Sequence, residues 1–175
     1  MTSIHERVRD AVTDVPDFPK PGILFKDITP VCADPALFRD VVGHWASVFA
    51  EAGVTHIAAV ESRGFIFGAP LALAMNLPLV IVRKPGKLPR PTISVSYGLE
   101  YGTDTLHIHD DALKAGDRVL ILDDVLATGG TAAATAELVE KCGASVAGFA
   151  FLIELAFLEG RAKLSAHPVD SVYTY

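Results

Sequence analysis

The sequence has few cysteines and no excess of positive charge. Cys32 and Cys142 lie far apart and match no Cys-x-x-Cys or Cys/His spacing of a metal site. Reduced thiols are typical of a reducing compartment, so we expect a cytoplasmic protein. The 175 residues carry a formal net charge of −6, with a pI near 5.4. Domains that bind nucleic acid usually have a strong basic excess, so we expect no nucleic-acid partner.

The sequence also lacks a secretory signal and an unbroken membrane span. Its first ten residues, MTSIHERVRD, contain no apolar core of a signal peptide. Residues 65–82 form a stretch of 18 residues without a charge, which is close to the length that crosses a bilayer. Pro70, Asn76 and Pro78 interrupt this stretch, and Asn-Leu-Pro is typical of a break between a helix and a strand. We therefore expect no membrane partner.

What is present is the pattern of one globular domain over residues 1–175. Half of the residues are hydrophobic and 21% are charged, which is typical of a folded chain. Apolar strands alternate with helices from residue 56 onward. We expect strands at 56–60, 79–83, 118–122 and 144–153, and helices at about 65–75 and 130–142. This alternation predicts an α/β fold with a central parallel sheet flanked by helices, whose ligands bind beyond the carboxyl ends of the strands.

The segments around this alternation have patterns of their own. A capping box, Ser3-x-x-Glu6, predicts a short N-terminal helix that ends near Val12. Residues 14–30 hold four prolines and predict turns, and Asp34-Pro35 predicts the start of a helix over 35–52. Residues 84–102 show no helix or strand pattern, and irregular segments of this length are often lids over a binding site. We expect a flexible lid there.

A loop of small residues, 127–131, connects the expected strand at 118–122 to the helix that follows. Small residues allow backbone N–H groups to converge, and the start of the helix adds a positive dipole end. The hydroxyls of Thr128 and Thr131 are further donors. The loop is therefore a candidate phosphate site, although it has neither GxxxxGK[ST] nor GxGxxG. The alternative is a glycine-rich helix cap without a ligand.

Two carboxylates, Asp123 and Asp124, come directly before this loop. They would repel a phosphate unless each had a partner of its own. Carboxylates accept hydrogen bonds from the vicinal hydroxyls of a ribose, and they can bind Mg²⁺ through its water shell. A sugar phosphate would explain both the loop and the carboxylates. The alternative is a metal site or a solvated end of the strand.

Four cations follow the two neighbouring strands of the expected sheet. Arg63 follows the strand at 56–60, and Arg83, Lys84 and Lys87 lie at the end of the strand at 79–83. Cations gathered at one rim of an acidic protein predict a second anion site. Taken singly, each could instead be a solvated surface charge. Two anion sites beside a hydroxyl site indicate a substrate with phosphates at both ends.

The stretch VLILDDVLATGGT resembles the 5-phosphoribosyl-1-pyrophosphate (PRPP) signature of the type I phosphoribosyltransferase family. The resemblance spans nearly the whole chain, in the order DFPKPGILFKDITP (17–30), ESRGFIFGAPLA (61–72), RKPGKLP (83–89), SYGLEYGTD (97–104) and IELAFLEGRAKL (153–164). The signature indicates a phosphoribosyltransferase. The segments GILFKDITP, RKPGKLP and LEYG are similar to those of the adenine branch of the family.

The resemblance implies the type I phosphoribosyltransferase fold, with a small N-terminal hood at about 1–33 that binds the base, and with a flexible lid loop. It implies purine salvage, in which the 5-phosphoribosyl group moves from PRPP to adenine and gives AMP and pyrophosphate. It further implies Mg²⁺ held mainly through PRPP or pyrophosphate, and a homodimer whose partner subunit supplies some pyrophosphate contacts. There are two alternatives. One is a phosphoribosyltransferase for another purine base, and the other is a regulator that senses PRPP or purines.

The resemblance also implies a role for each matching residue. The 5′-phosphate and ribose of PRPP or AMP would bind at Asp123, Asp124, Ala127, Thr128, Gly129, Gly130 and Thr131. Pyrophosphate would bind at Ser62, Arg63, Arg83, Lys84 and Lys87, and adenine at Leu24, Phe25 and Lys26. The catalytic residues would be Glu100, as acid and base, together with Tyr101 and Arg63. Lys26 stands where some relatives carry Arg, so a bidentate side-chain contact there would be lost.

Overall fold

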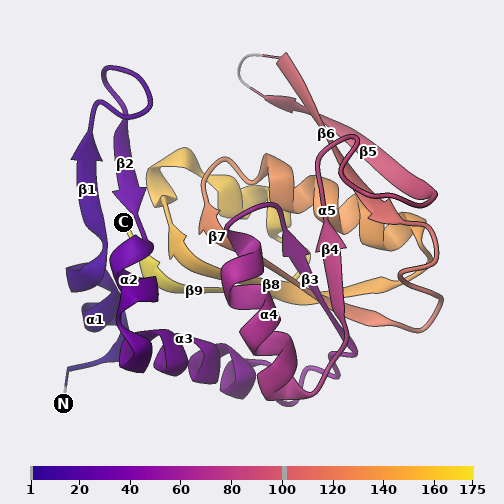
Figure 1. Ribbon diagram of the computed structural model, residues 1–175, viewed down its shortest axis with the longest axis horizontal. Coiled ribbons are helices and arrows are strands. Elements are labelled where there is room, and N and C mark those ends of the chain that lie inside the picture. The colour runs from indigo at the N-terminus through magenta and orange to yellow at the C-terminus, as the bar shows by residue number, and fades with distance from the viewer. Residues whose placement is uncertain (1, 100–101) are drawn as a thin grey trace.

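A computed structural model of the chain describes residues 2–99 and 102–175. Its centre is a five-stranded sheet in the order β4-β3-β7-β8-β9, and every neighbouring pair is parallel. The strands are β3 (His56–Val60), β4 (Leu79–Val82), β7 (Arg118–Leu126), β8 (Ser145–Glu154) and β9 (Val169–Thr174). The predicted α/β fold with a central parallel sheet is confirmed (Figure 1).

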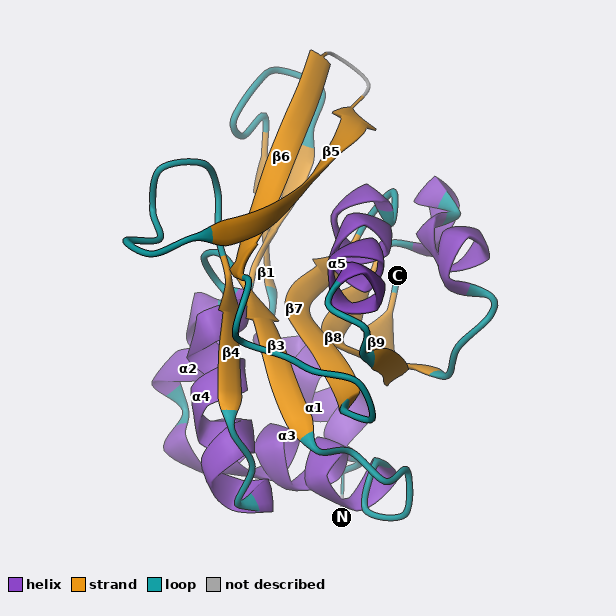
Figure 2. Cartoon of the chain, turned by 90° about the vertical axis from the view of Figure 1, so that its right-hand side faces the viewer, coloured by secondary structure: helices purple, strands orange, loops and turns teal. Residues whose placement is uncertain are grey.

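Helices cover both faces of the sheet because its inner strands are apolar on both sides. In β7, Val119 and Ile121 belong to the core cluster that includes Leu138 of α5 (Gly130–Lys141). Leu120 and Leu122 belong to the opposite cluster. That cluster is covered by α1 (Ile4–Ala11), α2 (Thr29–Ala33), α3 (Pro35–Val48) and α4 (Gly64–Met75). Figure 2 shows α5 on one side of the sheet and α1–α4 on the other.

The N-terminal helices begin as the sequence predicts. Ser3 and Glu6 form the capping box of α1, and the Asp34 carboxylate accepts hydrogen bonds from two N–H groups in the first turn of α3. The prediction that this helix extends to residue 52 was wrong, because α3 ends at Val48. Phe49 is buried in the core and leaves the helix conformation, and turns carry the chain from there to Gly53, whose φ is +66°.

The predicted irregular segment 84–102 is partly a β-ribbon. β5 (Thr92–Leu99) pairs antiparallel with β6 (Gly102–His109) from Thr92↔His109 to Leu99↔Gly102. The prediction of no regular structure was therefore wrong for β5. Its side chains alternate, with Val95 buried and Ser94 and Ser96 exposed, which is the period of a half-buried strand. The ribbon projects beyond the sheet at the upper right of Figure 1.

The N-terminal helix contacts the last strand of the sheet, where the His5 ring lies within hydrogen-bonding distance of the Val172 carbonyl oxygen. A second antiparallel hairpin, β1 (Thr13–Pro16) with β2 (Leu24–Asp27), lies near the C-terminus in Figure 1. β9 and the short 3₁₀ helices η1 (Ala156–Leu158) and η2 (Gly160–Leu164) were not predicted.

The uncharged stretch 65–82 is divided between α4 and β4. Within the described part of the chain, no helix has the length and apolar character needed to cross a membrane.

Candidate active site

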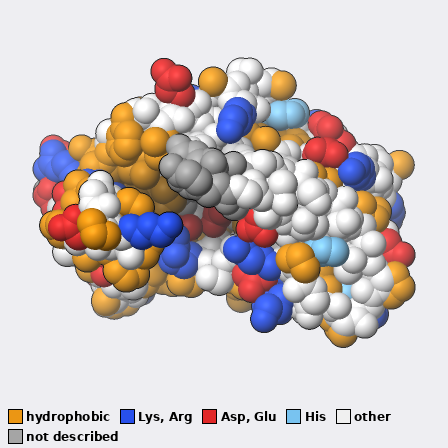
Figure 3. Space-filling view, turned by 90° about the horizontal axis from the view of Figure 1, so that it is seen from above, with side chains coloured by type: hydrophobic (Ala, Val, Ile, Leu, Met, Phe, Trp, Pro, Cys, Tyr) orange, Lys and Arg blue, Asp and Glu red, His pale blue; other side chains and the backbone are white. Residues whose placement is uncertain are grey.

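The candidate site lies where the carboxyl ends of β3, β4 and β7 meet the start of α5. One cavity is lined by the loop 127–131, and a neighbouring cavity of about 400 Å³ is lined by residues from both sides of the rim. Ligand sites commonly span about 300–1,000 Å³. Figure 3 looks onto this rim and shows acidic and basic side chains together in a central hollow. The predicted position of the site, beyond the carboxyl ends of the strands, agrees with this geometry.

The loop 127–131 has the backbone of an anion site. Gly129 is the N-cap of α5 with a φ of +75°, a left-handed conformation that favours glycine. Gly129 has no side chain to cap the first N–H groups of α5, so these donors can bind a ligand. The hydroxyl of Thr131 lies 3.1 Å from that of Tyr97 on β5, which brings the ribbon next to the loop.

Asp123 and Asp124 lie within β7 and not after it. The prediction that the strand ends at residue 122 was wrong, because β8 continues alongside and pairs with β7 as far as Leu126↔Glu154. β3 pairs with β7 only up to Leu122, so the two carboxylates stand at an edge that β3 leaves open. Successive side chains of a strand point to opposite faces. Asp123 accordingly lines the loop cavity, whereas Asp124 forms an ion pair with Arg63.

The environment of the two carboxylates makes their charge costly. Asp124 is buried, with a relative exposure of 4%, and the Arg63 side chain compensates its charge. Burial, and then the neighbouring Asp124, raise the pKa of Asp123 well above its usual range. Asp123 also accepts a hydrogen bond of 2.9 Å from the Asp124 N–H. A Cβ on Gly64 would lie 2.9 Å from the Leu122 carbonyl oxygen, so this glycine lets the start of α4 approach the pair.

Two of the predicted cations of the rim, Arg83 and Lys84, are paired with carboxylates that the sequence analysis missed. Both Nε and Nη2 of Arg83 lie 3.3 Å from oxygens of Glu61, and the Lys84 Nζ lies 3.1 Å from Asp104. A hydrogen bond from the Lys84 N–H lowers the pKa of Glu61, and Asp104 raises the pKa of the Lys84 amine. The sequence did contain a signal for Glu61, because this residue stands directly before the predicted site residues Ser62 and Arg63.

Only some of the residues predicted to bind pyrophosphate and ribose line the larger cavity. Ser62, Arg63 and Lys84 line it together with Asp123 and Asp124, and Glu61, Tyr97 and Asp104 complete its polar lining. The side chains of Arg83 and Lys87 are not among the lining residues. The predicted catalytic residues Glu100 and Tyr101 lie outside the described residues.

A third, mainly apolar cavity adjoins Arg63 under the β1–β2 hairpin. It is lined by Val15, Phe18, Phe25, Asp27, Ile28, Thr29 and Arg63. The rings of Phe18 and Phe25 lie 5.1 Å apart, edge to face, and the Arg63 guanidinium carbon lies 5.6 Å from the centre of the Phe25 ring. Such a pocket can hold a flat aromatic ligand against a ring face. The sequence analysis missed Phe18, which is brought to Phe25 by the hairpin turn.

Leu24 and Lys26 alternate with Phe25 along β2, and neither lines this pocket. The Lys26 Nζ donates to Asp14 at 2.6 Å and lies 3.8 Å above the ring of Tyr175. Burial raises the pKa of the Tyr175 hydroxyl to about 12. Any contact of residue 26 with a ligand in the pocket would therefore come from its backbone, and the exchange of Arg for Lys would not affect such a contact.

Comparison with known proteins identifies the family of this chain. The model of the phosphoribosyl transferase domain matches residues 33–172. This chain belongs to the phosphoribosyl transferase family. The matched residues of this phosphoribosyl transferase include both carboxylates, the loop and the cations. Residues 1–32, with the β1–β2 hairpin and Phe25, precede the match.

Individual members of the family are similar over almost the full chain. A relative from Kosmotoga olearia named adenine phosphoribosyltransferase is 54% identical, over 96% of this chain and 99% of its own length. The crystal structure of adenine phosphoribosyltransferase from Thermoanaerobacter pseudethanolicus is 48% identical with a TM-score of 0.95, covering 99% of this chain and 100% of that one. The enzyme from Saccharomyces cerevisiae, solved with an imino-altritol bisphosphate and adenine, is 41% identical with a TM-score of 0.91, covering 98% and 99%.

Proposed function

We propose that this phosphoribosyl transferase acts in purine salvage and transfers the 5-phosphoribosyl group from PRPP to adenine, giving AMP and pyrophosphate. The observation that carries the proposal is the order of the three cavities along one rim. Asp123 lines both the loop cavity and the larger polar cavity, and Arg63 lines both the polar cavity and the aromatic pocket. This order matches phosphate, ribose and base in a nucleotide. The names of the relatives support adenine as the base.

Each part of the substrate has a place in this arrangement. The loop 127–131 binds the 5′-phosphate through its N–H groups and the Thr128 and Thr131 hydroxyls. Asp123 and Asp124 accept hydrogen bonds from the ribose hydroxyls. Ser62, Arg63 and Lys84, which line the larger cavity, bind the pyrophosphate. Arg83, which is paired with Glu61 of that cavity, and Lys87 add positive charge to the same site. Phe25 stacks on the adenine, while Leu24 and Lys26 present backbone groups to its edge.

The reaction needs stabilisation of opposite charges on the two sides of one breaking bond. N9 of adenine forms a bond to C1 of the ribose while the bond from C1 to the pyrophosphate oxygen breaks. Positive charge develops on the ribose ring and negative charge on the leaving pyrophosphate. Arg63 and Lys84 stabilise the leaving group. Their carboxylate partners Asp124 and Asp104 hold them in position before the substrate arrives. Glu100 takes the proton of the purine, and Tyr101 covers the ribosyl centre.

The donor set of the larger cavity is compatible with Mg²⁺. Glu61, Asp123 and Asp124 provide the carboxylate oxygens that this ion prefers. In the described ranges 2–99 and 102–175, no group of three or more His, Cys, Asp or Glu side chains is placed to hold a metal ion alone. Asp123 and Asp124 would therefore hold Mg²⁺ through water and substrate oxygens. Bound there, the ion would neutralise charge on the pyrophosphate.

Residues 1–175 form one phosphoribosyltransferase domain in this proposal, with about 1–33 as the hood over the base, and the chain acts as a cytoplasmic homodimer. The exposed apolar side chains of α4 and β4 support the dimer. Leu73 is 83% exposed and Ile66 is 41% exposed, and both lie on α4. Leu73 lines one surface groove together with the exposed Leu79 of the edge strand β4. Apolar patches of this kind commonly mark protein interfaces.

A crystal structure with bound AMP tests the assignment of the three cavities at once. We expect the phosphate at the loop 127–131, the ribose hydroxyls on Asp123 and Asp124, and the adenine against Phe25. Adenine bound away from the β1–β2 hairpin, or a phosphate bound at Arg63 and Lys84 in place of the loop, would contradict the assignment.

A further inference from the structure

The segment that follows β8 packs directly against the back of the loop 127–131. A Cβ on Gly160 would lie 2.1 Å from the Ala127 carbonyl oxygen and 2.8 Å from the Gly129 nitrogen. A Cβ on Gly129 would in turn lie 2.4 Å from the Gly160 carbonyl oxygen. The two backbones are therefore in contact with no side chain between them. Any shift of Gly160 must move the loop or open a gap behind it.

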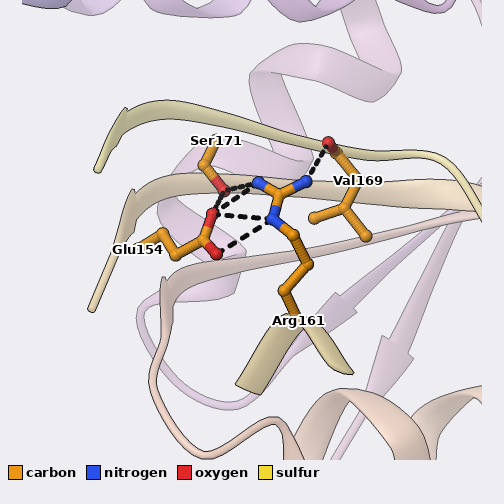
Figure 4. A network of polar contacts seen from close by, with 4 residues as sticks. All are labelled: Glu154, Arg161, Val169 and Ser171. Atoms are coloured by element: carbon orange, nitrogen blue, oxygen red, sulfur yellow. Dashed lines mark hydrogen bonds and ion pairs between the residues drawn. The ribbon is translucent and has the colours of Figure 1, made fainter. Parts of the chain in front are cut away.

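Arg161, the next residue, is fixed by four acceptors on β8 and β9 (Figure 4). Its Nε donates to both carboxylate oxygens of Glu154, at 2.9 and 3.2 Å, and its Nη2 forms a third bond to the same carboxylate. Its Nη1 donates to the Val169 carbonyl at 2.9 Å, and its Nη2 lies 3.3 Å from the Ser171 hydroxyl. That hydroxyl donates to Glu154 at 2.9 Å. The planar guanidinium of an arginine carries several N–H donors in a fixed geometry, so it can bond all of these acceptors at once.

Glu154 links this network to the start of the loop as well. It is buried, at 5% relative exposure, and it pairs with Leu126 across the sheet. The next residue, Leu155, donates its N–H to the Leu126 carbonyl at 2.9 Å. The ion pair with Arg161 lowers the pKa of Glu154, so the carboxylate keeps its charge in this buried position. Both Leu126 before the loop and Gly129 within it thus touch the segment that Arg161 anchors.

We infer that Arg161 is a positioning residue for the 5′-phosphate: its ion pair with Glu154 holds Gly160 against the loop 127–131 and fixes the loop in its phosphate-binding conformation. The inference rests on the proposed function, because it takes the loop as the phosphate site. Arg161 itself does not line the cavity of the loop. Because Arg161 keeps the loop ordered before the phosphate arrives, binding does not lose free energy to ordering the loop.

The test compares two ligands that differ only in the 5′-phosphate. The dissociation constants of AMP and adenosine are measured by titration calorimetry for the wild-type chain and for Arg161→Met. We expect the Kd of AMP to rise about tenfold, which equals about 1.4 kcal/mol, while the Kd of adenosine stays the same. In turnover, the KM of PRPP should rise more than kcat falls.

Two further variants separate positioning from general loss of stability. Val172→Ala removes buried volume from β9, next to Ser171, and should lower the melting temperature without changing the Kd of AMP. Arg161→Lys keeps the charge but loses the fork, so it should show a smaller rise of the same selective kind. It also serves as the test variant if Arg161→Met does not fold.

The outcomes are distinct. An unchanged Kd of AMP in Arg161→Met and Arg161→Lys would overturn the positioning role, and so would an equal loss of AMP and adenosine binding. A selective loss of AMP binding in Val172→Ala would also overturn it, since any loss of stability would then produce the effect. A wild-type chain that bound no AMP would instead overturn the proposed function.

Discussion

Substituting Gly160 by alanine tests whether the contact of two backbones shapes the phosphate site. The added Cβ would lie 2.1 Å from the Ala127 carbonyl oxygen, whereas ordinary contact requires at least 3.4 Å. One of the two backbones must therefore move by about 1 Å, and a misplacement of that size can cost an enzyme up to about a hundredfold in rate. Overpacking of this kind also costs about 1–3 kcal/mol in the free energy of unfolding.

The assay is the initial rate of AMP formation at saturating adenine and varied PRPP. We expect Gly160→Ala to lower kcat/KM for PRPP by about tenfold to a hundredfold. Gly43→Ala is the matched control, because its Cβ would meet no atom within 4 Å and the residue lies in α3. The control should keep its rates and gain about 0.5–1 kcal/mol in stability. Wild-type kcat/KM and an unchanged melting temperature in Gly160→Ala would refute the reasoning.

Four further predictions address the separate parts of the site and the assembly. Asp123→Asn should weaken AMP binding yet raise the free energy of unfolding at neutral pH, because the raised pKa of Asp123 makes its ionised form unfavourable in the folded state. The gain, measured by urea unfolding, should shrink as the pH falls toward the unfolded pKa of about 3.9, and a gain that does not depend on pH would contradict it. Phe25→Ala should weaken adenine binding by about 1–3 kcal/mol and leave ribose 5-phosphate binding unchanged in calorimetry. Leu73→Glu should convert dimers to monomers in analytical ultracentrifugation, and a monomeric wild-type chain would refute the dimer. Glu100→Ala should lower kcat sharply with little change in PRPP binding, and near-normal turnover would exclude it as the acid and base.

The sequence predicts most of the sheet because its buried strands are continuous apolar runs. β3 was predicted with the bounds that the structure shows, and β8 within a residue at each end. The extension of β7 through Asp123 and Asp124 was not predictable from local pattern. It depends on β8, which continues alongside and supplies the hydrogen-bonding partner. β9 was missed because its sequence, VDSVYT, has few apolar residues, and its pairing with β8 forms it.

Part of the candidate site was visible in the sequence, but its pairings were not. The loop 127–131, the two carboxylates and Arg63 were visible as a pattern, since each lies in or just after the carboxyl-terminal part of a strand on one rim. Their partners lie far away in the sequence, and local patterns carry no information on such contacts. Arg63 and Asp124 are 61 residues apart, and Arg83 and Glu61 are 22 apart. The place of Phe18 beside Phe25 depends likewise on the fold of the β1–β2 hairpin.

The most direct test of the central claim is the turnover of purine bases by the wild-type chain. The purified protein is incubated with PRPP, Mg²⁺ and either adenine, hypoxanthine or guanine, and the nucleotide and pyrophosphate formed are quantified. We predict that adenine is converted to AMP with an equal amount of pyrophosphate, and with a kcat/KM well above that of the other two bases. A higher kcat/KM for guanine or hypoxanthine, or PRPP binding without any AMP formed, would contradict the account.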